Sequence, residues 1–293
     1  MSLKAFIDYL EIEKNYSNNT IISYNNDLTS FENYISNEFS VKLIEDSNYS
    51  HIRSWIINLV DSGISNKSVN RKISSLNSFF KFCLKIGIIK ENPLRNHRSL
   101  KIKKEIQLPF SENEMFDVLN EDNFENSFEG LRDRMIIELF YSTGIRRIEL
   151  VNLKINDIDL SNNQIKVLGK RNKQRIIPLI FTTKDLILNY LKLRYGINSK
   201  NDYLFITNKG KKIYEKLVYR IINKYFNNIS TKVKKSPHII RHSFATHLLN
   251  NGADLNSVKD LLGHSSLAAT QVYTNRSIEE IKKVFAKSHP RNK

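Results

Sequence analysis

The sequence predicts a mainly α protein of two domains: a helical bundle over residues 1–95, and an α+β domain with a small antiparallel sheet over residues 110–293. Apolar residues recur at helical spacing throughout the first range, without a convincing strand. Residues 96–109 lack such a period and are rich in lysine and arginine, which is typical of a linker. After Ile155 the apolar period becomes two, and helical spacing returns after about Thr183.

Four helices account for the first domain. Ser2 is a suitable N-cap for the first, the second covers about 19–36, the third follows Ser50, and the fourth follows Ser65. Short connections between them predict a compact bundle, whose core takes up the aromatic residues and leaves no stacking platform for bases. The predicted core residues are Leu3, Phe6, Ile7, Leu10, Ile21, Tyr24, Leu28, Phe31, Ile35, Ile52, Trp55, Ile56, Leu59, Val69, Ile73, Leu76, Phe80 and Leu84.

The second domain begins with a capping box, in which Ser111 and Glu114 cap each other's backbone. A second such box, Ser277 and Glu280, predicts the start of a final short helix, too short to be stable without docking. Between them the spacing predicts helices over about 130–142, 145–153, 183–195 and 214–227, and short strands near 158–160, 165–167 and 176–179. Residues 169–173 form a cation-rich hairpin turn between two of these strands.

Composition restricts the partners. The net charge is +16, from 46 Lys and Arg against 30 Asp and Glu, which favours a polyanion, either nucleic acid or an anionic membrane surface, over a basic enzyme indifferent to DNA. The longest apolar run, about 55–60, is far shorter than the roughly 20 residues that a membrane helix needs. The N-terminus resembles no signal peptide, and the single Cys83 allows no intramolecular disulfide. We therefore expect a cytoplasmic protein with no membrane partner.

Chemistry-bearing side chains recur through the second domain at Arg146, Lys170, His238, Arg241, His264 and Tyr273. Cleavage of a phosphodiester without metal needs fixed positive charge on the non-bridging oxygens, and guanidinium groups bind those oxygens in a fork. A lysine on a turn can protonate the leaving oxygen if neighbouring arginines lower its pKa. A tyrosine is a suitable nucleophile when cations favour its phenolate. This set predicts chemistry on a phosphate.

A zinc site is the alternative for the histidines. His238 and His242 are four residues apart, as in a helical metal motif, but that motif requires glutamate directly after the first histidine and the chain has Ile239. Carboxylate and cysteine ligands at useful spacing are also missing. The sequence therefore predicts no metal, and we expect no cofactor.

Five stretches together resemble the signature of the tyrosine recombinase/integrase family. They are Ser-Thr-Gly144-Ile-Arg146-Arg-Ile-Glu149-Leu, Gly169-Lys170 before Arg175-Ile-Ile-Pro178-Leu, His238-Ile-Ile-Arg241-His, Leu262-Gly263-His264, and Tyr273. Their order and gaps are similar to those of the Xer recombinases. The helical N-terminal part resembles the core-binding, SAM-like domain of the same group, so the likeness covers nearly the whole chain.

The resemblance implies a role for each residue. Tyr273 is the nucleophile that forms a 3′-phosphotyrosyl link, and Lys170 is the general acid towards the leaving 5′ oxygen. Arg146 and Arg241 hold the scissile phosphate. His238 acts as acid or base and His264 as a hydrogen-bonding partner. Strand exchange then needs neither ATP nor metal, and takes place in a synapse of four protomers on two duplexes.

Two positions depart from the family pattern. Ile148 stands where serine is common, which removes a hydroxyl near Arg146, and Asn275 stands where a histidine is frequent. Neither change removes a catalytic group, so the resemblance implies an active enzyme.

In this family the two domains clamp DNA. The early turns of the fourth helix carry Lys67, Asn70 and Arg71, which are suited to the major groove or, alternatively, form a solvated polar face. The last helix packs on a neighbouring protomer in this family, although its apolar side (Ile278, Ile281, Val284 and Phe285) is equally compatible with docking in cis.

The sequence therefore predicts a site-specific DNA recombinase that cuts and rejoins double-stranded DNA, and that resolves chromosome or plasmid dimers. Its expected partners are further protomers in a homo- or heterotetramer, including a second Xer-type recombinase, and a DNA translocase. The alternatives are an integrase or transposase of a mobile element, a type IB topoisomerase, a metal-dependent hydrolase, and a DNA-binding architectural protein without catalysis.

Overall fold

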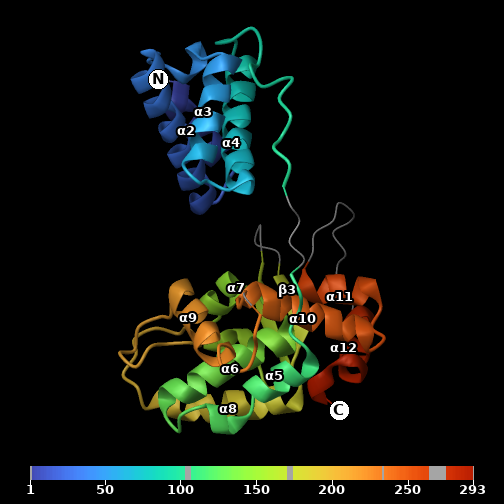
Figure 1. Ribbon diagram of the computed structural model, residues 1–293. Helices are drawn as coiled ribbons and strands as arrows, with labels where there is room; N and C mark the ends of the chain where they lie inside the picture. Colours follow the sequence, from blue (N-terminus) through green and yellow to red (C-terminus); the bar gives the residue numbers. More distant parts are fainter. Residues whose placement is uncertain (1, 103–106, 170–173, 233, 264–274, 293) are drawn as a thin grey trace. The chain divides into compact units, whose positions relative to one another are not determined.

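The computed structural model describes residues 2–102, 107–169, 174–232, 234–263 and 275–292, and the chain forms two compact units, 1–105 and 106–293 (Figure 1). Each unit has its own apolar core. The predicted mainly α fold with one small antiparallel sheet is confirmed. Within the described ranges, no helix is long and apolar enough to cross a membrane.

The first unit is a bundle in which α4 contacts α1, α2 and α3. Most of the predicted core residues are buried, and at the centre the rings of Phe31 and Trp55 lie 4.9 Å apart. Asn48 caps α3 by accepting hydrogen bonds from the backbone of Ser50 and His51, so this helix begins slightly earlier than predicted. The elements are α1 (Ser2–Asp8), the π-helix η1 (Tyr9–Glu13), α2 (Asn18–Phe39), the 3₁₀ helix η2 (Ile44–Asp46), α3 (Tyr49–Asp61) and α4 (Asn66–Lys85).

One core prediction in α4 is wrong. Leu84 is 44% exposed, and Cys83 is buried in its place. The buried stripe reaches Phe80 by alternating steps of four and three residues, and the next three-residue step reaches Cys83 rather than Leu84. Leu84 therefore points about 100° away from the stripe, because each residue advances a helix by that angle.

The segment after α4 stays attached to the first unit. Leu94 is buried in its core and Leu100 packs against it. The Asn70 side chain donates to the Leu100 carbonyl and accepts from the Leu100 amide, at 2.9 Å each, and Asn66 donates to the Lys101 carbonyl at 2.9 Å. These bonds hold the first part of the cation-rich stretch along the fourth helix.

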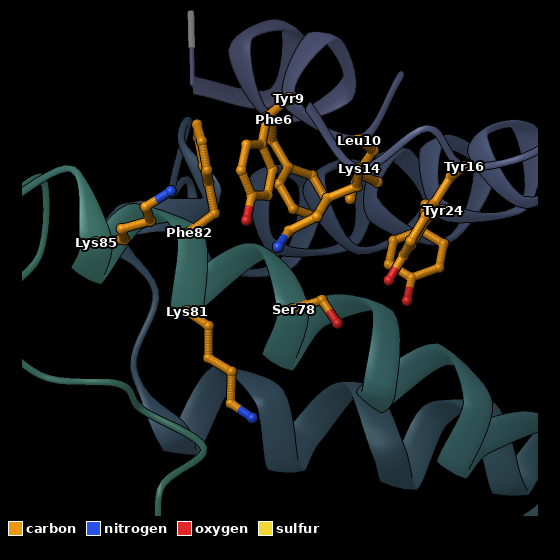
Figure 2. A pocket seen from close by; sticks show the side chains of 10 residues that line it. All are labelled: Phe6, Tyr9, Leu10, Lys14, Tyr16, Tyr24, Ser78, Lys81, Phe82 and Lys85. Atoms are coloured by element: carbon orange, nitrogen blue, oxygen red, sulfur yellow. The ribbon is translucent and has the colours of Figure 1, made fainter. Parts of the chain in front are cut away.

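A small pocket of about 160 Å³ lies among α1, η1, α2 and α4. Figure 2 shows the side chains that line it. Its lining combines tyrosines with lysines. The ammonium groups of Lys14 and Lys85 lie 5.5 and 5.0 Å from the centre of the Tyr9 ring, within the range of a cation–π contact. The two lysines therefore pack against Tyr9 within the first unit.

The second unit is built around α6, which contacts α8, α9 and α10 and is buried on nearly every side (Figure 1). The predicted capping box at the start of the second unit is confirmed, since Ser111 and Glu114 each accept a hydrogen bond from the other's backbone amide. The helices are α5 (Glu112–Val118), η3 (Glu121–Asn123), α6 (Phe128–Thr143), α7 (Arg147–Asn152), η4 (Ile155–Asp157), α8 (Phe181–Tyr195), α9 (Glu215–Phe226), α10 (Pro237–Asn250), α11 (Leu255–Leu262), α12 (Asn275–Ser288) and η6 (Pro290–Asn292).

The sheet consists of β1 (Ile158–Asp159), β2 (Gln164–Leu168) and β3 (Gln174–Pro178), antiparallel in the order β1-β2-β3. Its inward positions follow the predicted alternation, with Ile165 opposite Ile177 in the core. One step nearer the turn, Val167 lies opposite Arg175, whose side chain is also buried. A charged residue therefore occupies an inward position of this sheet.

The end of the chain docks in cis on the second unit. Phe285 is buried and His289 is fully buried, and α12 starts at Asn275, two residues before the predicted cap. His289 Nε2 donates to the Tyr141 carbonyl at 3.2 Å, and Arg291 donates to Glu138 at 2.9 Å. Both partners belong to α6, so the tail is anchored on the central helix.

This docking predicts a pH dependence of stability. Burial, together with Arg291 and His247, lowers the pKa of His289 from 6.5 to about 4, although the bond to Tyr141 opposes the shift. The neutral form of His289 is therefore favoured in the folded state. The contribution of this neutral side chain to the unfolding free energy is complete above pH 6.5 and is lost as the pH falls towards 4. We expect the unfolding free energy of the wild type, relative to His289→Gln, to fall by about 2 kcal/mol between pH 7.5 and 5.

Urea unfolding followed by far-ultraviolet circular dichroism measures this difference. The single tryptophan, Trp55, lies in the first unit and supplies an internal control. The unfolding transition that its fluorescence reports should be the same in the wild type and in His289→Gln. A difference between the two proteins that stays constant with pH would contradict the prediction.

Candidate active site

Arg146 stands at the junction of α6 and α7, where the chain turns sharply. Gly144 ends α6 with φ +58°, and a Cβ there would lie 2.5 Å from Cδ1 of Phe244, so a larger residue would clash and be strained. Arg146 then precedes α7, and its backbone amide donates to Glu149 Oε2 at 2.8 Å. The turn thus fixes both the backbone of Arg146 and the carboxylate beside it.

Arg241 reaches the same place from α10. Its side chain is buried, yet its guanidinium donates at 2.6 Å to the carbonyl of Gly144 and at 2.6 Å to that of Leu262. The first bond joins it to the α6–α7 turn, and the second joins it to the end of α11. Sequence positions nearly a hundred residues apart thereby meet in one corner of the second unit.

Three successive carbonyls at the end of α11 each accept a hydrogen bond from a different arginine. Arg175 Nε donates to Leu261 at 2.9 Å, Arg241 donates to Leu262, and Arg146 Nη2 donates to Gly263 at 2.9 Å. The last carbonyls of a helix lack partners within it and carry partial negative charge. The helix end therefore organises these guanidinium groups, which with Glu149 we call the arginine cluster.

Glu149 is the counter-ion of the cluster. Its two oxygens accept from both terminal nitrogens of Arg175 at 2.8 Å, and Oε1 also accepts from Arg146 at 2.8 Å. Burial alone would raise the pKa of Glu149, but these bonds outweigh burial and lower it to about 2. The carboxylate is therefore ionised at neutral pH.

The cluster holds more positive than negative charge. Burial, and then the neighbouring Arg146 and Arg175, lower the pKa of Arg241 to about 9, so the group remains protonated at neutral pH. Three guanidinium groups face one carboxylate, which leaves about two positive charges uncompensated. Arg146 keeps 34% of its side chain exposed. Such a site is chemically suited to an anion with several oxygens, such as a phosphate.

The predicted site residues divide into two groups. Arg146 and Arg241 are brought together, and His238 lies exposed on the first turn of α10, three residues before Arg241. The predicted residues Lys170, His264 and Tyr273 lie outside the described residues.

Sequence reasoning assigned no role to Glu149 or Arg175, although both stand within the quoted motifs. The available signal was the strand period: Arg175 shares the inward face of β3 with Ile177, where a charged residue needs a partner. Glu149 could have been found as the acid in the first turn of α7, where it caps the backbone of Arg146.

The predicted DNA-contacting residues of α4 have different surroundings. Lys67 is exposed, whereas the Asn70 amide is bonded to the Leu100 backbone. Arg71 donates to Asp27 on α2 and to Ser23 at 2.8 Å, and half of its side chain remains exposed. The structure thus gives Asn70 and Arg71 contacts within the first unit that sequence spacing did not predict.

Ile148, in place of the common serine, is exposed on α7, and Arg146 is held by Glu149 and Gly263 without that hydroxyl.

Among the residues that the structure describes, no group of three or more His, Cys, Asp or Glu side chains is arranged to hold a metal ion.

Comparison with known proteins identifies the family. Residues 109–280 match the phage integrase family, and residues 3–87 match its N-terminal SAM-like domain. Tyrosine recombinase XerC of Anoxybacillus flavithermus is 39% identical over 299 residues, covering 99% of this chain and 98% of that protein. XerC of Bacillus subtilis is 34% identical over 302 residues, with 99% and 96% covered.

Solved structures agree in fold. The crystal structure of XerA recombinase has 25% identity and a TM-score of 0.51, covering 96% of this chain and 97% of that one. XerH site-specific recombinase bound to palindromic difH substrate has 23% identity and a TM-score of 0.73, covering 97% and 84%. On this evidence the chain belongs to the phage integrase family, the tyrosine recombinases.

Proposed function

We propose that this protein is a site-specific DNA recombinase that cuts and rejoins DNA through a phosphotyrosyl intermediate. The observation that carries the proposal is the convergence of Arg146 and Arg241 on neighbouring carbonyls at the end of α11, with more positive than negative charge around them. Fixed guanidinium groups are what a metal-free phosphoryl transfer needs, because charge accumulates on the non-bridging oxygens in the transition state.

In the proposed reaction Tyr273 attacks the scissile phosphate. Its phenolic oxygen forms a bond to phosphorus as the bond from phosphorus to the 5′ oxygen breaks, and Lys170 gives a proton to that oxygen. His238 takes up the proton of the phenol, and His264 donates a hydrogen bond to the phosphate. The products are a 3′-phosphotyrosyl link and a free 5′ hydroxyl. The reverse reaction with a 5′ hydroxyl of another strand rejoins the DNA.

The residues close to Lys170 and His264 in the sequence support these roles. In the sequence Lys170 comes between β2 and β3, and Arg175, near the start of β3, bonds to the counter-ion of Arg146. His264 directly follows Gly263, whose carbonyl accepts from Arg146. His264 is therefore adjacent in the chain to a residue that Arg146 contacts, and Lys170 is five residues from Arg175.

For DNA binding we propose that the first unit is the core-binding domain and that the early turns of α4 face the duplex. Lys67 is exposed and Arg71 is half exposed, so both have charge available for phosphate or base contacts. The amide of Asn70 is bonded to Leu100, and we propose that it orders the segment after the helix. In this scheme residues 96–109 connect this domain to the catalytic domain, 110–293.

The biological role that we propose is the resolution of chromosome or plasmid dimers in the cytoplasm, in a synapse of four protomers on two duplexes. The similarity to XerC proteins over nearly the whole chain supports this role. A related structure, that of XerH site-specific recombinase bound to palindromic difH substrate, is a post-cleavage complex, which supports cleavage of DNA. A second Xer-type recombinase and a DNA translocase are proposed partners.

A nicked suicide substrate that carries the candidate site tests the proposal in the presence of EDTA. We expect a covalent protein–DNA band on a denaturing gel for the wild type and no band for Tyr273→Phe, because phenylalanine lacks the attacking oxygen. Tyr203→Phe is a matched control and should keep the band, since the Tyr203 ring contacts the ammonium groups of Lys154 and Lys212 and has no part in the proposed reaction. A band that survives in Tyr273→Phe would sink the assignment of the nucleophile.

A further inference from the structure

Arg175 has more roles than a structural arginine usually has. Its guanidinium makes three hydrogen bonds, two to Glu149 at 2.8 Å and one to the Leu261 carbonyl at 2.9 Å, and its side chain is almost fully buried. Burying a charge in this way is costly unless every bond is satisfied. A hydrophobic residue at this inward position of β3 would fill the space without that cost, so the arginine needs a further explanation.

Its location joins three parts of the proposed reaction. Arg175 lies opposite Val167 in the β2–β3 ladder and follows Lys170 by five residues in the sequence. Through Glu149 it is linked to Arg146, and through Leu261 it is linked to the end of α11, just before His264. Gly263 approaches it so closely that a Cβ there would lie 3.0 Å from Cδ of Arg175.

We propose that Arg175 is a positioning residue for strand cleavage, which ties β3, and with it the hairpin that carries Lys170, to Arg146 and Arg241, the two arginines that hold the phosphate. The inference rests on the proposed function and deepens it. In this proposal Arg175 itself contacts neither the phosphate nor the leaving group. It sets the base of the hairpin relative to Arg146, so the proton donor meets the leaving 5′ oxygen only when this anchor is intact.

Lysine cannot replace it. A lysine carries one compact ammonium group, whereas Arg175 uses three nitrogens in a fixed plane to reach Glu149 and Leu261 together. In Arg175→Lys the counter-ion keeps a positive neighbour, but the hairpin loses its fixed register with α11. A misplacement of about 1 Å can slow a reaction by about 100-fold. We therefore expect cleavage to slow by about 10- to 100-fold.

The test compares two nicked suicide substrates that differ in one atom, the bridging 5′ oxygen or a sulfur in its place. A thiolate leaves without protonation because its pKa is far below that of an alcohol, so the sulfur substrate does not need the acid. We expect Lys170→Met and Arg175→Lys to be slow on the oxygen substrate and to be restored towards the wild-type rate on the sulfur substrate. Both rates come from the same protein preparation, so their ratio is independent of the folded fraction.

The controls separate positioning from stability. Arg175→Gln removes the charge as well and should show the same ratio, whereas Gln174→Ala, at the exposed neighbour on β3, should show the wild-type ratio. If Arg175→Lys and Arg175→Gln slow both substrates equally, Arg175 only stabilises the fold and the proposal is overturned. A wild type without a Tyr273-dependent adduct would instead overturn the proposed function itself.

Discussion

Replacing Arg241 with alanine is expected to slow cleavage of the phosphodiester by about 100- to 1,000-fold, because one fixed donor to the charged transition state is lost. Its proposed oxygen contacts are made most strongly in the transition state, so the affinity for DNA should change little. Many other lysines and arginines contribute to binding of the duplex in a chain of net charge +16. Single-turnover formation of the covalent adduct measures the rate, and gel retardation measures the affinity.

A buried arginine outside the cluster supplies the matched control. Arg194 in α8 is also buried and also donates to backbone carbonyls, those of Tyr203 and Leu204. Arg194→Ala should lower stability without changing the rate per folded molecule. Equal losses of rate in the two variants would show that Arg241 acts through the fold alone.

The second large effect concerns stability. Glu149→Ala is expected to lower the unfolding free energy of the second unit by about 3–5 kcal/mol, because it leaves Arg175 and Arg241 buried with no counter-ion. Urea unfolding followed by circular dichroism measures the loss. Since the pKa of Glu149 is lowered from 4.5 to about 2, this stabilisation is complete above pH 4.5 and is lost as the pH falls towards 2.

Glu215→Ala provides the comparison. Glu215 pairs with Arg147 on the surface of the second unit, where both side chains are partly exposed. An exposed ion pair contributes at most about 1 kcal/mol, so this variant should be close to the wild type in stability. A Glu149→Ala protein as stable as Glu215→Ala would contradict the assignment of Glu149 as the counter-ion of the cluster.

The helices were predictable because their signals are local. The capping pair Ser111 and Glu114 and the glycine that ends α6 at Gly144 lie within a few residues of the structure that they determine. The misplaced Leu84 shows the limit of local spacing, since four-residue and three-residue steps fit the same stripe equally well until a neighbouring helix selects one. Start positions differed by a residue or two for a similar reason.

The candidate site was predictable in its residue types but not in its construction. Motif spacing singled out Arg146 and Arg241 as phosphate-binding groups, and nothing in that spacing shows which carbonyls hold them. Arg175 stood in another of the quoted stretches without a role, because its partners Glu149 and Leu261 lie 26 and 86 residues away. Pairings between residues so far apart in the sequence depend on the tertiary fold.

The sequence alone determined the mainly α two-domain organisation, the small sheet, the excess of positive charge and the family, because periodicity, composition and motif order are properties of the chain. Only the tertiary structure decided that three arginines share the end of α11, that one glutamate neutralises them in part, and that the tail docks on α6 through His289. Buried charges and helix ends must find partners wherever folding brings them, and that choice is made by packing rather than by local sequence.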